Sequence, residues 1–94
     1  MTVNGETKML DFGEILRNKR LQEGMTLKTL AYELDKMRDK GDKGLTESYL
    51  SLLETGKRPI TFPLLRVIIR RFPDLWGEAI AYTVSYLAAK DEGG

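Results

Sequence analysis

The side chains best able to do chemistry in this chain are carboxylates, because its 94 residues contain no histidine and no cysteine. The commonest nucleophiles, general bases and thiolate metal ligands are therefore missing. Two carboxylate pairs, Asp35 with Asp39 and Asp39 with Asp42, are close enough in sequence to suggest oxygen ligands for a cation. Lysines and arginines alternate with these carboxylates, and neighbouring positive charge opposes cation binding. We therefore expect no enzyme activity, no metal site and no cofactor.

Positive charge lies mainly in the first three-quarters of the chain. Residues 1–72 hold fourteen Lys and Arg against ten Asp and Glu, whereas residues 73–94 hold one against four. The net charge of the whole chain is only +1. A polyanionic partner such as DNA would therefore contact the first part of the chain rather than its acidic end. Arg66, Arg70 and Arg71 lie close together without a neighbouring acid, and such a cluster most often forms a solvated helix face.

Helical patterns fill the chain after residue 10, and no strand pattern or repeat is present. Asp11, Thr26, Thr46 and Asp74 each precede an apolar helical pattern and can cap a helix, whereas Gly24 and Gly56 can end one. Pro63 suits the first turn of a fourth helix. The expected helices are 12–23, 27–40, 47–55, 61–72 and 74–89, between a flexible N-terminus at 1–10 and a frayed tail at 90–94. The residues expected to face inward include Phe12, Leu16, Leu21, Leu30, Leu34, Tyr49, Leu50 and Leu53. Together the patterns predict one all-α domain over 1–94.

Two stretches, KRLQEGMTLKTLAYEL and LTESYLSLLETGKRP, carry a resemblance to a known family. The first has a basic pair, a Gly, a capping hydroxyl and a Leu-Ala pair in order, and the second has a hydroxyl cap followed by Leu-Glu-x-Gly. In these features the chain resembles the Cro-like, or XRE, helix-turn-helix domains over residues 12–72. The resemblance implies a compact five-helix, lambda-repressor-like fold with its DNA-binding core at 11–72. It also implies a sequence-specific transcriptional regulator, most simply a repressor, that binds double-stranded DNA by inserting helix 47–55 in the major groove.

The same resemblance assigns roles to individual residues. The positions that read bases in the family are held here by Glu47, Ser48, Leu52 and, at their margin, Ser51. The positions that bind phosphate are held by Thr26, Lys28, Lys57 and Arg58. Arg20 and Glu54 occupy the positions of an internal ion pair, which we expect to be structural. Glu47 and Leu52 depart from the usual base-reading residues, since a carboxylate can accept only from a cytosine amine and an aliphatic side chain can contact only a thymine methyl group.

The segment DKMRDKGDKG, residues 35–44, lies between the second and third predicted helices. Family members usually cross between these helices in a few residues, whereas here eleven separate Leu34 from Thr46. The segment therefore predicts an enlarged turn inside the helix-turn-helix rather than a linker. Either it is a solvated extension without function, or Lys40 and Lys43 bind flanking phosphates.

The C-terminal helix has two apolar stripes, one starting at Trp76 and the other at Leu75. One stripe can cover the core and leave the other for a partner, or both can belong to one wide buried surface. We expect a homodimer through this helix, with an interface formed by Leu75, Trp76, Ala79, Tyr82 and Tyr86.

A second function is compatible with the same fold. The chain could be a protein-interaction module, such as an antitoxin-like or phage-type adaptor, with Leu27 and Leu52 as exposed apolar anchors and a protein partner on the C-terminal helix. No stretch reaches the roughly 20 apolar residues that a membrane-spanning helix needs, so we expect no membrane contact and a cytoplasmic protein.

Overall fold

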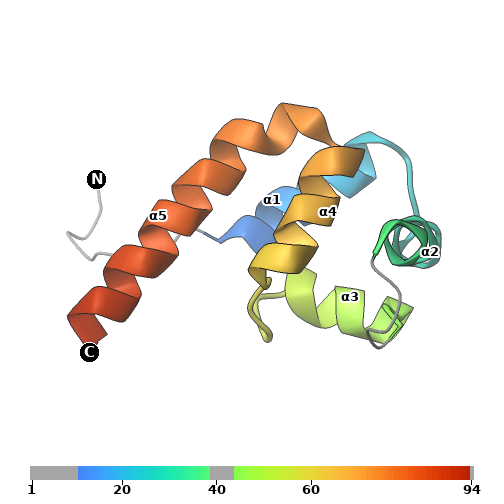
Figure 1. Ribbon diagram of the computed structural model, residues 1–94. Helices are drawn as coiled ribbons and strands as arrows, with labels where there is room; N and C mark the ends of the chain where they lie inside the picture. Colours follow the sequence, from blue (N-terminus) through green and yellow to red (C-terminus); the bar gives the residue numbers. More distant parts are fainter. Residues whose placement is uncertain (1–10, 39–43, 94) are drawn as a thin grey trace.

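Five α-helices account for most of the residues described by the computed structural model, which covers 11–38 and 44–93, with side chains through residue 88. No strand occurs in this part of the chain, which confirms the all-α prediction. The helices are α1 (Phe12–Gln22), α2 (Leu27–Met37), α3 (Glu47–Glu54), α4 (Phe62–Arg71) and α5 (Trp76–Gly93), with a 3₁₀ turn at Pro73–Leu75 before α5. Figure 1 shows α1 to α4 gathered into one body and α5 running diagonally along one side of it. The predicted flexible N-terminus at 1–10 lies outside the described residues.

Three of the predicted helix caps are present. Asp11, Thr26 and Thr46 each accept a hydrogen bond on a side-chain oxygen from the backbone amide three residues later, at 3.0–3.1 Å. Each bond satisfies one of the amides that the first turn of a helix leaves unpaired. Thr61 precedes α4 without such a bond, and Pro63 lies in the first turn of that helix, as expected. Short local signals therefore set where α1, α2 and α3 begin.

The boundaries of two helices differ from the prediction. Helix α2 ends at Met37 rather than near residue 40, because Arg38 adopts an extended backbone with φ of −78° and ψ of 158°. Helix α5 begins at Trp76, since Pro73–Leu75 forms a tight turn in which the Leu75 amide donates to the Phe72 carbonyl oxygen. Asp74 lies inside this turn and is not the predicted cap of α5. The backbone of α5 remains helical to Gly93, beyond the predicted end at residue 89, and the frayed tail at 90–94 stays a prediction.

A single hydrophobic core joins all five helices and includes residues from every one of them. Its most deeply buried members are Phe12, Leu16, Leu30, Leu34, Leu50, Leu53, Ile68 and Phe72. Each fully buried side chain of this size stabilises the fold by about 1.5–3 kcal/mol relative to an exposed one. Only the first half of α5 contributes, and in Figure 1 its C-terminal half extends beyond the other helices.

Two residues predicted to face inward are exposed instead. Leu21 follows Leu16 by five positions on α1, and Tyr49 precedes Leu50 by one on α3. At 3.6 residues per turn, these spacings rotate a side chain by about 140° and 100° from its buried neighbour. Both side chains therefore point away from the core.

None of the helices in the described ranges is long and apolar enough to cross a membrane.

Candidate nucleic-acid interface

The first turn of α3 presents polar side chains to solvent. The cap at Thr46 starts the helix so that Leu50 and Leu53 point into the core, which leaves Glu47 and Ser48 exposed. The other two predicted base-reading residues, Ser51 and Leu52, are partly buried. All four lie on one helix of eight residues, but only the first turn is fully accessible to a large partner.

Arg20 joins the end of α3 to the beginning of α2. Its guanidinium donates to both carboxylate oxygens of Glu54, from Nε at 2.8 Å and from Nη2 at 3.0 Å. Its Nη1 donates at 2.9 Å to the carbonyl oxygen of Met25, the residue before the α2 cap. Only 8% of the Arg20 side chain and 2% of the Glu54 side chain are exposed. The predicted structural ion pair is therefore present, and it brings the start of α2 next to the end of α3.

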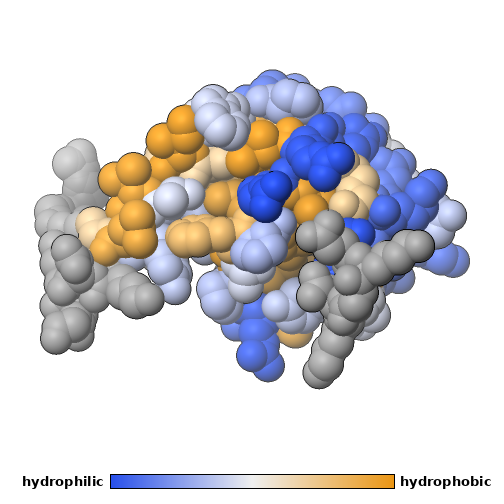
Figure 2. Space-filling view, viewed as in Figure 1, coloured by the Kyte–Doolittle hydropathy of each residue, from blue (hydrophilic) through white to orange (hydrophobic). Residues whose placement is uncertain are grey.

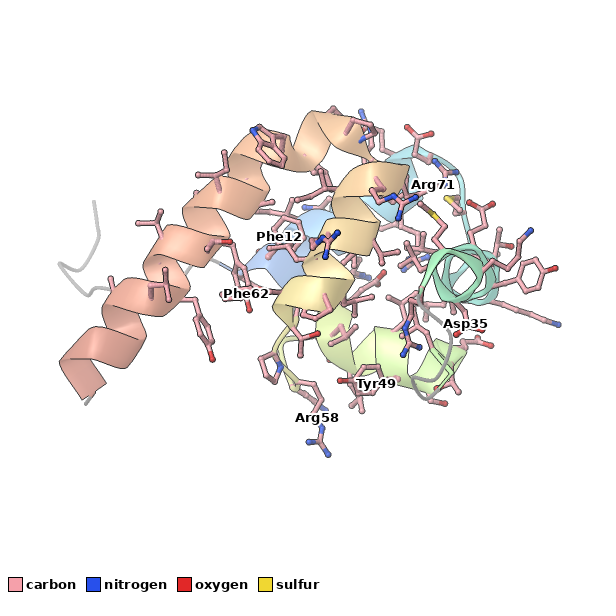
Figure 3. All side chains as sticks on the ribbon, in the orientation of Figure 1. Phe12, Asp35, Tyr49, Arg58, Phe62 and Arg71 are labelled. Carbon is pink, nitrogen blue, oxygen red and sulfur yellow. The ribbon has the colours of Figure 1, made fainter. Side chains whose placement is uncertain are left out.

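The loop after α3 is held in shape by its own backbone. Gly56 adopts a φ of +77°, a left-handed conformation that other residues rarely take, and this ends the helix. The amides of Lys57 and Arg58 then both donate to the Leu52 carbonyl oxygen, at 2.9 and 3.3 Å. Both side chains are exposed, and Figure 3 shows Arg58 extending from this loop away from the body of the protein. The loop thus holds two cations at the end of α3.

The beginning of α2 offers a second place for an anion. Thr26 and Lys28 are exposed, and the Thr26 hydroxyl also donates to the Thr29 hydroxyl at 3.0 Å. Within residues 11–38 and 44–88, no carboxylate forms an ion pair with Lys28, Lys57 or Arg58. Because Arg20 holds Met25 beside Glu54, the start of α2 and the 57–58 loop both lie near the same end of α3. Thr26, Lys28, Lys57 and Arg58 are therefore all exposed on segments that adjoin α3, and their phosphate-binding role stays a prediction.

The exposed carboxylate of Glu47 makes the two ends of α3 electrostatically different. At the first position of the helix, it interacts favourably with the positive end of the helix dipole, but it repels phosphate. The cations Lys57 and Arg58 follow the other end of α3, where positive charge is favourable to the helix dipole. Leu27, which sequence analysis offered as an exposed anchor, packs against the core and is only partly accessible.

Asp35 ties together the two ends of the enlarged turn. Its Oδ1 accepts at 2.7 Å from the amide of Leu45 and at 3.3 Å from Nη1 of Arg38. Leu45 is buried, so this bond fixes the chain just before the α3 cap. Sequence analysis assigned no such role to Asp35, because its partner amide lies ten residues away. Lys40 and Lys43, the predicted phosphate-binding residues of this segment, lie outside the described residues.

The predicted dimer interface on α5 is corrected by the structure. Leu75, Ala79 and Tyr82 belong to the core of their own chain, and the Tyr82 hydroxyl donates to the Ile60 carbonyl oxygen at 3.1 Å. Burial raises the pKa of this hydroxyl. Tyr86 is partly buried and meets the ring of Phe62 edge-on, with centroids 5.5 Å apart. Three of the five proposed residues are therefore unavailable to a partner.

The other stripe of α5 is exposed. It consists of Trp76, Ile80, Val84 and Leu87, of which Trp76 is 59% and Val84 61% exposed. Beside it, an apolar groove of about 260 Å³ runs between α4 and α5, and its lining includes Phe62, Leu65 and Ile69. Figure 2 shows hydrophobic surface along this part of α5. Of the predicted interface residues, only Trp76 lies on this exposed stripe.

One further exposed residue belongs to the candidate interface although sequence analysis placed it in the core. Tyr49 lies in the first turn of α3 beside Glu47 and Ser48, where its ring can reach a partner. Its position one residue before the buried Leu50 was the signal that could have shown this.

Comparison of the chain with protein-family models, with curated proteins and with solved structures found no match.

Proposed function

We propose that this protein is a DNA-binding transcriptional regulator, which inserts the first turn of α3 in the major groove and represses by occupying its site. The observation that carries the proposal is the Arg20 corner, where one buried guanidinium joins Glu54 at the end of α3 to Met25 at the start of α2. This corner orients a capped helix beside two groups of cations that lack acidic partners in the described chain. The resemblance of residues 12–72 to Cro-like domains supports the same function.

The proposed binding mode divides the contacts between affinity and specificity. Lys57, Arg58 and Lys28, with the amides at the start of α2, bind phosphates and supply most of the affinity. Ser48, Ser51 and Tyr49 contact base edges with little preference, so specificity depends on Glu47 at a cytosine amine, on Leu52 at a thymine methyl group, and on DNA shape. We therefore expect salt-sensitive binding of modest sequence preference.

A salt-dependent titration against random and genomic DNA pools tests the function directly. We expect a Kd tighter than about 10⁻⁴ M at low salt and a linear fall of log affinity with log salt concentration. No binding tighter than about 10⁻⁴ M at low salt would remove the DNA-binding function, since even non-specific binders usually exceed that affinity.

The phosphate role of the loop after α3 can be tested separately. The double variant Lys57→Ala, Arg58→Ala should bind all DNA sequences more weakly and should reduce the salt slope by about 2, because two phosphate contacts are lost. The matched control is Arg17→Ala with Lys36→Ala, which removes the same charge from exposed positions on α1 and α2. An equal loss in both double variants would show that only net charge matters and would remove the loop from the interface.

For the exposed face of α5 we propose a second copy of this chain as the partner. Trp76, Ile80, Val84 and Leu87 form an apolar stripe beside a groove, and a two-fold dimer would bury the same stripe from both chains. A dimer would also match the two half-sites, one helical turn apart, that regulators with this motif bind. The interface thus proposed replaces the one expected from the sequence.

Val84→Glu tests this interface because it puts a charge in the middle of the stripe. We expect the variant to be monomeric by sedimentation equilibrium at concentrations where the wild type is dimeric. Ala81→Glu is the matched control, since Ala81 is exposed on a neighbouring face of the same helix. A monomeric wild type would contradict the dimer.

The unpaired face of α5 also favours a second candidate function. A different protein could occupy the stripe of Trp76, Ile80, Val84 and Leu87, and the chain would then act as an interaction module on the same fold. The negative charge of Glu47 at the start of α3 supports this alternative, because it weakens phosphate binding there. A wild type that is monomeric and fails to bind DNA would favour the interaction module over the regulator.

A further inference from the structure

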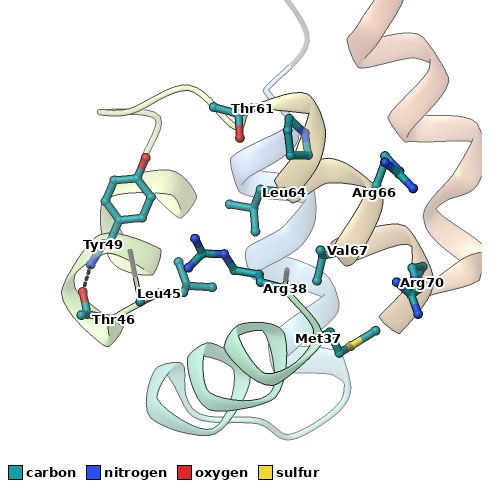
Figure 4. Close-up of a pocket in the computed structure, with 12 residues that line it drawn as sticks. Met37, Arg38, Leu45, Thr46, Tyr49, Thr61, Leu64, Arg66, Val67 and Arg70 are labelled. Atoms are coloured by element: carbon teal, nitrogen blue, oxygen red, sulfur yellow. Dashed lines mark hydrogen bonds between the residues drawn. The ribbon is translucent and has the colours of Figure 1, made fainter. Parts of the chain in front are cut away.

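A cavity lies between the end of α2, the start of α3 and α4. It has a volume of about 430 Å³, and residues from the end of α2, the start of α3 and most of the length of α4 surround it (Figure 4). The sequence does not predict this cavity, because its walls come from segments far apart in the chain. Its lining residues are Met37, Arg38, Gly44, Leu45, Thr46, Tyr49, Thr61, Pro63, Leu64, Arg66, Val67 and Arg70.

The charges that line this cavity are all positive. Arg66 and Arg70 are one helical turn apart on α4, both are exposed, and neither forms an ion pair with any described residue. Arg71, their neighbour on α4, differs because its Nε donates to Glu33 of α2 at 2.6 Å. Arg38 adds a third guanidinium and donates to Asp35. No carboxylate is among the lining residues, so an anion would face two arginines without an acidic partner in the described chain.

The remaining walls of the cavity are mainly apolar. Leu45, Leu64 and Val67 are buried core residues that form its inner surface, and Met37 packs partly against them. Figure 4 shows Arg66 and Arg70 along α4 on one side of this surface, with Thr46 and Tyr49 of α3 on the other. Ligand cavities typically have this combination of an apolar lining and a few polar groups, in the range of about 300–1,000 Å³.

We propose that this cavity binds a small organic carboxylate with an apolar body. The arginines of α4 hold the carboxylate, since a guanidinium can donate two parallel hydrogen bonds to its two oxygens. The apolar body lies against Leu45, Leu64 and Val67 and displaces water from them. Tight binding needs both parts of the ligand. Acetate would bind weakly because it lacks the apolar body, and an alkane would bind weakly because it lacks the charge.

The position of the cavity connects it to α3. Thr46, the cap of α3, and Tyr49, in its first turn, both line the cavity. A bound ligand therefore contacts the helix that we propose to enter the major groove, and it changes the affinity for DNA. This regulatory part rests on the proposed function, whereas binding of the carboxylate does not.

Titration with octanoate, monitored by backbone amide NMR, tests the site without DNA. Octanoate has about ten non-hydrogen atoms, and we expect a Kd of about 1 mM or tighter, with the largest shifts at Leu45, Tyr49 and Val67. Octanamide, which has the same shape without the charge, and acetate should bind at least about tenfold more weakly. Equal binding of octanamide would overturn the proposal. So would shifts confined to α5, which the only tryptophan, Trp76, would report by fluorescence.

Variants of the two arginines identify the carboxylate-binding groups. Arg66→Met with Arg70→Met should weaken octanoate binding by about tenfold or more. Arg17→Met, which removes an exposed arginine outside the cavity, should leave octanoate binding unchanged. A double variant that folds normally and binds octanoate as tightly as the wild type would overturn the assignment.

Repeating the DNA titration with octanoate separates the two proposals. A change in DNA affinity that is lost in the Arg66→Met, Arg70→Met variant supports regulation through the cavity. Octanoate binding without any DNA binding would contradict the proposed function and leave the site intact, whereas DNA binding unaffected by bound octanoate would contradict only the regulatory part.

Discussion

Two consecutive cations of α1, Lys19 and Arg20, form ion pairs at two different junctions of the domain. Arg20 meets Glu54 of α3 in the interior, with bonds of 2.8 and 3.0 Å and almost no exposure. Lys19 meets Asp74, in the turn before α5, at 2.7 Å, but the Asp74 side chain is 60% exposed. The distances are similar, so the difference between the two junctions lies in burial.

Burial decides what each pair does for the fold. At the α3 junction, the charges have lost their water, so each depends on the other and the geometry of the helix pair is tightly held. At the α5 junction, water and salt screen the charges, and apolar packing holds the helix instead, including the rings of Phe12 and Tyr82 with centroids 5.7 Å apart. Four substitutions can test this contrast between a charge-dependent and a packing-dependent junction.

Arg20→Met should have the largest effect. It leaves the Glu54 carboxylate buried without a partner and also removes the donor to the Met25 carbonyl oxygen, so we expect a loss of about 3–5 kcal/mol in the free energy of unfolding. Urea denaturation followed by circular dichroism measures it. Arg17→Met, at an exposed position, should change stability by less than about 0.5 kcal/mol.

A double variant sharpens the interpretation of Arg20. Arg20→Met with Glu54→Met should recover much of the lost stability, because no charge is then left buried alone. A loss below about 1 kcal/mol for Arg20→Met would contradict the contrast between the two junctions, since it is the effect expected of a surface pair.

Gly13→Ala should have the second largest effect, again at the α3 junction. A Cβ atom at Gly13 would overlap the backbone carbonyl oxygen of Leu53, and backbone cannot move aside as a flexible side chain can. We expect a loss of about 1–3 kcal/mol by the same denaturation measurement. Gly77→Ala on α5 is the matched control: an added Cβ there meets nothing within 4 Å, so stability should be kept or slightly raised. Equal effects at the two glycines would contradict the close contact of α1 with α3.

Tyr82→Phe should have a smaller effect at the α5 junction. The ring packing remains, but the Ile60 carbonyl oxygen loses its donor, so we expect a loss of about 1 kcal/mol. Because burial raises the pKa of Tyr82 above its ordinary value of 10.0, its contribution is present below that pH and is lost as pH rises through the raised pKa. The Tyr82→Phe variant should not show this loss of stability at alkaline pH. Thermal melts across the alkaline pH range would measure it. Tyr32→Phe, at an exposed tyrosine, should reproduce the wild-type profile.

Asp74→Asn should have the smallest effect of the four. The hydrogen bond from Lys19 lowers the pKa of Asp74 below its ordinary value of 3.8. Its stabilising contribution is therefore present above that pH and is lost as pH falls through the lowered pKa. The difference in melting temperature between wild type and variant should shrink at acid pH and in about 1 M salt. Glu78→Gln, an exposed acid of α5 without an ion pair in the described chain, is the control. A difference that persists in high salt would contradict the exposed nature of this pair.

Local signals predicted the helix starts better than the helix ends. Asp11, Thr26 and Thr46 cap α1, α2 and α3 as expected, because a capping side chain acts on an amide only three residues away. The end of α2 and the start of α5 were not predicted, and the first of these involves a contact over a longer separation in the chain. Asp35 bonds to the Leu45 amide just beyond the end of α2, and a tight turn at Pro73–Leu75 delays the start of α5.

The family resemblance predicted which residues form the candidate interface. It did not predict how exposed each of their side chains is. The Arg20–Glu54 pair is present as expected, and Lys57 and Arg58 are exposed. Ser51 and Leu52 are partly buried, and Tyr49 is exposed rather than inward. A helical pattern gives the angle between side chains, and the neighbouring helices then set how much of each face is covered.

The all-α class and the three caps follow from the sequence, because they depend on short spacings. The buried pair of Arg20 and Glu54 was predicted only from the family resemblance, since its partners are far apart in the chain. Which stripe of α5 meets the core, how tightly Gly13 approaches Leu53, and where Arg66 and Arg70 meet an apolar cavity follow only from the folded chain. Both α5 stripes are apolar, so their hydrophobicity could not distinguish them. The packing of α1 and α4 against Leu75, Ala79 and Tyr82 buried one and left Trp76, Ile80 and Val84 exposed.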